Sequence, residues 1–211
     1  MSKQQFALLV SFWTAVGIGG SAVGAYASRD WQFGLGLLLI PFVMSIVGTM
    51  IALRSNEPII SLLGYALVAI PFGFMLGPVV AMYTVASVLK VFAVTTMITI
   101  VFGVVGAVIP DSLEGWGSAL FGCLLILIIG GFAVPIAGLF GLPITTALSV
   151  LDWCGVIVFT GLVIFDWNRA MRVERTHDNA IDCALAIYLD WVNLFIRLLS
   201  IMGTRTSSSD D

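Results

Sequence analysis

The stretch PIISLLGYALVAIPFGFMLGPVVAMYTVASVL fills residues 58–89 and contains no charged side chain. A helix needs about 20 apolar residues to cross the hydrocarbon core of a bilayer, so this run holds one crossing and the entry to a second. Three further charge-free runs fill residues 4–28, 31–53 and 115–151. Together these runs predict an all-α integral membrane protein.

The composition of the whole chain supports the same class. Of its 211 residues, 60% are hydrophobic and 10% are charged, and the mean hydropathy is +1.10. A soluble domain carries about 25% charged residues, so this chain could not cover its own surface in water. The same numbers exclude a disordered chain and a coiled coil. A net charge of −3 gives no reason to expect a nucleic-acid partner.

The long apolar runs must be divided into separate crossings. The run over 115–151 is too long for one helix, and its GLFGLP segment at 138–143 is a strong helix breaker. The run from residue 58 divides near 83–87, which lets Lys90 extend toward the interface. The sequence therefore predicts one domain over 1–202 with seven transmembrane helices, at about 6–27, 31–53, 59–82, 88–109, 116–137, 144–166 and 180–202. A disordered polar tail is expected over 203–211.

The basic residues between the spans predict the orientation. With alternating crossings, one side carries five basic residues and the other three: Lys3, Arg54, Arg169, Arg172 and Arg175 against Arg29, Lys90 and Arg205. The larger group marks the cytoplasmic side and includes the N-terminus. The compact loops favour a bacterial cytoplasmic (inner) membrane, with the endoplasmic reticulum as the alternative.

Cysteine usage gives no metal or disulfide framework. The three cysteines are Cys123, Cys154 and Cys183, with no CxxC or Cys/His ligand spacing. We interpret them as small buried hydrophobic residues, and we expect no tightly bound cofactor.

The last predicted span carries charges at membrane depth. Asp190 lies near its middle, and Asn193 and Arg197 follow on the same helix face. A charge at the bilayer centre costs roughly 2.5–3.5 kcal/mol even on lenient scales, so this polar stripe must face protein. The stripe predicts that the last helix is central to the bundle.

Two further aspartates belong to the sixth span. Asp166 ends that span, and Asp152 lies about 21 Å earlier on nearly the same face. Both side chains could simply fix packing through an interhelical ion pair or hydrogen bond. For Asp190 a functional role is favoured, because a buried carboxylate without one is usually replaced by an apolar residue.

These residues lie in recognisable motifs. Phe165-Asp166-Trp167-Asn168 and the stretch ALAIYLDWVNLFIRLL at 184–199 resemble the last two helices of the Bax inhibitor (transmembrane Bax inhibitor motif) family. The GFMLGP segment at 73–78 is similar to that family's Gly-x-x-x-Gly-Pro, and 109–122 is similar to the entry to its fifth helix. The chain departs from the family's Tyr-Asp-Thr-Gln pattern at Phe165, Trp167 and Asn168.

The resemblance implies a function. In this family the two aspartates are implied to form a pH-sensing pair in a calcium leak pathway, here Asp166 and Asp190. An arginine near the end of the second helix is implied to pair with the helix-seven aspartate, and Arg54 occupies that place. Asn193, Arg197 and Asp152 are expected to support the pair, with Ca²⁺ as the transported ion.

Elementary electrostatics fits such a pair. Two carboxylates about 4 Å apart repel by roughly 4 kcal/mol at an effective dielectric constant of 20. They therefore titrate as a unit and tend to hold one proton near neutrality. Ca²⁺ prefers about six to eight oxygen ligands, so two carboxylates predict weak, transient binding.

Two other classes of function are alternatives to the channel. Some bacterial relatives are implied to modulate a membrane-anchored ATP-dependent protease, and eukaryotic ones to restrain cell death. In that alternative the chain regulates a membrane partner through its helix faces or the loop over 169–178. An enzyme is not expected, because the motifs of intramembrane proteases are absent from the sequence.

Overall fold

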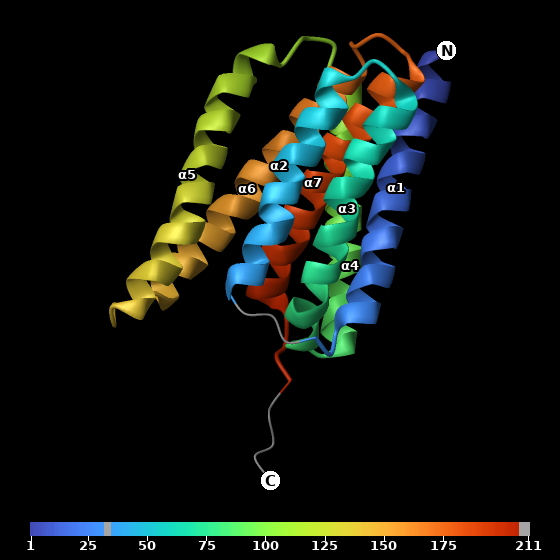
Figure 1. Ribbon diagram of the computed structural model, residues 1–211. Helices are drawn as coiled ribbons and strands as arrows, with labels where there is room; N and C mark the ends of the chain where they lie inside the picture. The colour runs from blue at the N-terminus through green and yellow to red at the C-terminus, as the bar shows by residue number, and fades with distance from the viewer. Residues whose placement is uncertain (32–34, 207–211) are drawn as a thin grey trace. The chain divides into compact units, whose positions relative to one another are not determined.

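The computed structural model describes residues 1–31 and 35–206, except for the side chains of residues 35–39 and 41. Apart from an isolated antiparallel bridge between Tyr83 and Arg205, these ranges contain helices and connecting loops and no strand. The prediction of an all-α chain is confirmed. In order (Figure 1), the helices are α1 (Lys3–Ser28), α2 (Leu35–Arg54), α3 (Pro58–Ala81), α4 (Val85–Val108), α5 (Glu114–Leu139), α6 (Thr145–Ala170) and α7 (His177–Met202).

Six of the helices in the described ranges have the length and apolarity to cross a membrane, and α2 contributes a shorter apolar stretch, Phe42–Arg54. Residues 32–34 of the expected second span lie outside the described residues. The chain is thus an integral, multi-pass membrane protein. Seven crossings, and a central position for the last helix, stay predictions.

The exposed positions of these helices carry large apolar side chains. Leu63 on α3 is 64% exposed, Ile126 on α5 is 67% exposed and Ile157 on α6 is 72% exposed. Such surfaces are stable against lipid chains and costly in water. Lipid contact also explains an error in the sequence interpretation, since Cys123 and Cys154 are exposed rather than buried.

The chain folds into two compact units. The first comprises Met1–Val88, Ala170–Leu189 and the chain from Thr204, and the second comprises Leu89–Arg169 and Asp190–Gly203. The α7 helix therefore supplies its first half to one unit and its second half to the other. The unit boundary falls directly before Asp190.

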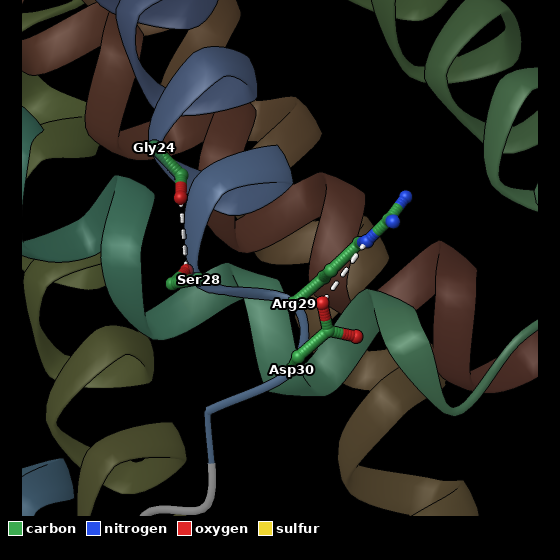
Figure 2. Close-up of polar contacts among 4 residues, drawn as sticks. All are labelled: Gly24, Ser28, Arg29 and Asp30. Carbon is green, nitrogen blue, oxygen red and sulfur yellow. Dashed lines mark hydrogen bonds and ion pairs between the residues drawn. The ribbon is translucent and has the colours of Figure 1, made fainter.

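In the first unit, α3 packs against both α1 and α2. The α1 and α3 backbones meet at glycines, because a Cβ on Gly24 would lie 3.1 Å from the carbonyl carbon of Gly73. Near the end of α1, the Ser28 hydroxyl donates to the carbonyl oxygen of Gly24 at 2.9 Å (Figure 2) and to that of Phe74 on α3 at 2.7 Å. The adjacent Arg29 forms an exposed ion pair with Asp30, which follows it (Figure 2).

The start of the C-terminal tail is ordered by backbone hydrogen bonds. The amide of Thr84 donates to the carbonyl of Thr204, and that of Thr206 donates to the carbonyl of Met82. Residues 204–206 thus pair with the α3–α4 turn, where the sequence led us to expect disorder from residue 203. The short turn leaves backbone groups free to pair, which a polar composition does not reveal. Residues 207–211 lie outside the described residues.

In the second unit, α4 and α6 approach closely. A Cβ on Gly106 of α4 would collide with the carbonyl oxygen of Ile164 on α6. One turn earlier, a Cβ on Gly103 would lie 2.7 Å from the indole of Trp167. This seam holds the C-terminal half of α6, which carries Asp166, against α4.

Candidate functional site

The second unit brings the two predicted aspartates together. Asp166, near the end of α6, and Asp190, in α7, are hydrogen-bonded to each other through their side chains. Asp190 is buried, at 5% exposure, and Asp166 is half-buried. We call these two residues the aspartate pair.

A hydrogen bond between two carboxyl groups requires a proton on one of them, because an ionised carboxylate only accepts. The hydrogen bond of the aspartate pair can therefore exist only while one of its two carboxyls carries a proton. The second oxygen of Asp190, Oδ2, is buried and has no hydrogen-bond partner among the described residues. A buried oxygen in that state is a strong acceptor for a cation or a proton donor.

A cation lies close to Asp166 on α6. Arg169 follows Asp166 by one turn of α6, is exposed, and lies close enough to attract the Asp166 carboxylate. The two carboxyls of the pair are thus unequal in their surroundings.

Aromatic side chains fix α7 immediately after Asp190. Trp191 is buried, stacks on Phe195 with a centroid distance of 5.3 Å, and meets Phe92 of α4 edge-on at 5.2 Å. Its indole N–H donates to the Thr96 hydroxyl of α4 at 3.3 Å. These contacts position the helix turn that carries Asp190 and exclude water from its surroundings.

Asn168 fixes the end of α6, two residues after Asp166. Its side chain is buried at 2% exposure and binds four backbone groups, one in the last turn of α4 and three in the α4–α5 connection. The amide nitrogen donates to three carbonyls and the amide oxygen accepts from one N–H, with partners Gly106, Ile109, Asp111 and Leu113. The sequence analysis noted this residue only as a departure from a family pattern. The signal that the sequence offered was an amide side chain at the end of an apolar span, where it must find hydrogen-bond partners.

The supporting residues form a cluster of their own. Arg197 of α7 forms an ion pair with Asp152 of α6, with 2.9 Å between Nη1 and Oδ1. The hydroxyl of Ser200 donates to the other oxygen of Asp152 at 2.5 Å. The structure thus brings Asp152 and Arg197 together, away from the aspartate pair along α6. Asn193 is half-buried on α7.

The predicted gating arginine belongs to the first unit. Arg54 is the last residue of α2 and is exposed, whereas the aspartate pair lies wholly in the second unit. Its pairing with Asp190 stays a prediction.

A cluster of buried hydroxyls in the first unit was missed by the sequence analysis. The hydroxyls of Ser21 on α1 and Tyr188 on α7 are 2.6 Å apart, and both reach the carbonyl oxygen of Ala69 on α3. Tyr65 stacks edge-on against Tyr188 and donates to the carbonyl of Trp13. The cluster fixes the α7 turn that precedes Asp190. No local pattern connects a serine and a tyrosine so far apart in the chain.

The described residues were also compared for clusters of metal-ligating side chains. Within residues 1–31 and 35–206, no set of three or more His, Cys, Asp or Glu side chains converges on one point. The aspartate pair offers two carboxylates, which suits an ion in transit better than a resident one.

Comparison with known proteins gives a consistent picture. Residues 3–207 match the family described as "Inhibitor of apoptosis-promoting Bax1". The inner membrane protein YbhL of Escherichia coli (strain K12) is 26% identical over 207 residues, which cover 94% of this chain and 86% of the relative. The YrjE protein of Lactococcus lactis is 27% identical over 84% of this chain and 76% of the relative. A protein of Borreliella burgdorferi is 27% identical over 96% of this chain and 93% of its own length.

Proposed function

This chain belongs to the Bax inhibitor family of membrane proteins, and from that premise we propose that it is a pH-sensitive calcium leak channel whose sensor is the aspartate pair. The observation that carries the proposal is the hydrogen bond between Asp166 and Asp190, which joins α6 to α7. Carboxyl groups within membrane helices are costly, and they mark ion pathways and proton relays.

Protonation changes the force between the two helices. With one proton on the pair, a hydrogen bond holds the carboxyls together. With none, two charges about 4 Å apart repel by roughly 4 kcal/mol at an effective dielectric constant of 20, enough to change a two-state equilibrium several hundred-fold. With two protons, the pair is neutral and releases any cation bound to it. The pair therefore converts pH into a choice between arrangements of α6 and α7.

The chemistry of the pair suits Ca²⁺ as a transported ion. Carboxylate oxygens are hard ligands of the kind that Ca²⁺ prefers, and the unpartnered Oδ2 of Asp190 is one such oxygen. Two carboxylates fall well short of a complete coordination shell, so waters and backbone carbonyls must supply the rest. Binding of this kind is weak, which allows an ion to leave as readily as it enters.

The proposal also includes the gating residue, the orientation of the chain and the membrane that holds it. Arg54 acts as a gating partner that competes for the charge of Asp190. The N-terminus is cytoplasmic, in accordance with the distribution of Lys and Arg between the loops. The membrane is a bacterial inner membrane, which the location of the Escherichia coli relative supports.

Calcium flux into dye-loaded proteoliposomes tests the proposal. The parent chain, Asp166→Asn and Asp190→Asn are compared over a range of pH, with Asp111→Asn as the matched control because that aspartate is exposed in the α4–α5 loop. We expect flux that varies with pH in the parent and the control, and flux that no longer varies with pH in the two pair variants.

Two results would reject the channel. One is an absence of flux above empty liposomes for protein shown to be folded and inserted, which would favour a regulator of a membrane partner. The other is an unchanged pH profile in both pair variants, which would separate the leak from the aspartate pair.

A further inference from the structure

A second polar cluster joins the same two helices that carry the aspartate pair. Asp152 lies in the second turn of α6, and its two carboxylate oxygens bind Arg197 and Ser200 of α7. Asp152 and Asp166 are about 21 Å apart along α6, a distance comparable with most of the roughly 30 Å hydrocarbon core. Polar side chains thus join α6 to α7 at two separate positions along the helices of the second unit.

The cluster is built into the backbone of α6. Gly155 lies beside the stem of Arg197, and a Cβ at that position would stand 3.0 Å from the guanidinium Nε and 3.1 Å from Cδ. A Cβ at this position would require the arginine stem to shift by a few tenths of an ångström. The side chains of Asp152 and Arg197 are only 13% and 20% exposed.

The cluster differs from the aspartate pair in its charge balance. An ion pair with one cation and one anion is neutral, and both oxygens of Asp152 have donors. No oxygen of Asp152 is left to coordinate a passing cation while these bonds persist. The aspartate pair, by contrast, keeps an unpartnered oxygen on Asp190.

We propose that Asp152, Arg197 and Ser200 form a second closure of the leak pathway, a lock that fastens α6 to α7 at a different depth from the aspartate pair. The proposal rests on the channel function proposed above. It assigns pH sensing to the pair and resistance to ion entry to the lock.

The lock has a closed state and an open state, which differ in the contact between Asp152 and Arg197. While it is closed, it holds the two helices together and keeps both carboxylate oxygens of Asp152 bound to donors. When it opens, Arg197 leaves Asp152, whose carboxylate then offers two oxygens to a cation. Because the sensor and the lock are different residues, breaking the lock raises the flux and leaves its pH dependence in place.

Neutral and reversed variants test the lock by calcium flux in proteoliposomes. The double variant Asp152→Asn/Arg197→Met removes both charges at once and leaves none unpaired, and Ser200→Ala is a milder change. We expect the double variant to raise resting flux roughly tenfold, as when a hydrogen bond to a charged group is removed from a two-state equilibrium. Its pH profile should keep the shape of the parent profile.

The reversed variant Asp152→Arg/Arg197→Asp restores the ion pair with the charges exchanged. Flux near the parent value in this variant, with raised flux in Asp152→Arg alone, would link the effect to the pair of charges. Lys90→Met and Asp111→Asn are the controls, because both remove an exposed charge from the same unit.

The outcomes separate the lock from the channel. Parent-like flux in the folded double variant would overturn the lock and leave the channel standing. Raised flux with a lost pH profile would also overturn it, because the cluster would then belong to the sensor. Absence of flux from the parent protein would overturn both proposals.

Discussion

Replacing Asn168 by alanine tests how strongly the end of α6 is fixed. The Asn168 amide has two N–H groups, which three backbone carbonyls share at 3.2 Å each, and one oxygen, which accepts the N–H of Leu113 at 3.1 Å. Two donors and one acceptor amount to three full hydrogen bonds. At about 1 kcal/mol each, the variant should lose about 3 kcal/mol of unfolding free energy.

Thermal unfolding in detergent measures this loss. For a chain of this size, 1 kcal/mol corresponds to a Tm change of about 2–4 °C, so we expect Asn168→Ala to unfold about 6–12 °C below the parent. Asn168→Asp should unfold at least as early, because a carboxylate cannot donate to the carbonyls of Gly106, Ile109 and Asp111.

The matched control is Asn56→Ala, since Asn56 lies exposed in the α2–α3 loop. Its Tm should stay within about 2 °C of the parent value, as for most surface substitutions. An Asn168→Ala variant that unfolds together with this control would refute the reasoning. The four contacts would then contribute nothing net, and the end of α6 would be held by the glycine seam alone.

Three further predictions concern packing and protonation. Gly106→Ala places a methyl group against the carbonyl oxygen of Ile164, so α4 and α6 must separate, and we expect a loss of about 1–3 kcal/mol in the same thermal assay. An unchanged Tm would mean that the seam is loose. Tyr188→Phe removes the hydroxyl that meets Ser21 at 2.6 Å and should lower the unfolding free energy by about 1 kcal/mol. Ser21→Ala and the double variant complete a double-mutant cycle, which measures the coupling energy between the two hydroxyls. Strict additivity would contradict a direct hydrogen bond. The aspartate pair holds a proton while its hydrogen bond exists, so the infrared band of a protonated carboxyl should weaken as pH rises and be missing from Asp190→Asn at neutral pH. A band that persists in that variant would place the proton elsewhere.

The class of the protein and the positions of its helices were accessible from sequence because they depend on local properties. The charge-free runs were sufficient to predict the membrane helices, since a helix that crosses the bilayer is recognised by its length and apolarity. Charge at membrane depth also pointed to Asp190, because each such residue carries a cost that a neighbour must offset. Family motifs then added Asp166 as its partner.

The identity of the contacts was decided by the tertiary structure. The sequence placed Arg197 on the helix face of Asp190, seven residues earlier, and the structure shows that it binds Asp152, 45 residues away. Helical spacing shows which side chains share a face but not which neighbouring helix that face meets. The cysteines were misjudged for a related reason, since an apolar surface in a membrane is as stable outside as inside.

The sequence by itself determined that this chain is helical, lies in a membrane and carries carboxyl groups there. Only the tertiary structure decided that Asn168 binds backbone groups up to 62 residues away and that Ser21 meets Tyr188 across 167 residues. The physical reason is that hydrophobicity sums over neighbouring residues along the chain, whereas a hydrogen bond needs two atoms within about 3 Å of each other. That distance is set by the packing of whole helices, to which every residue of the interface contributes.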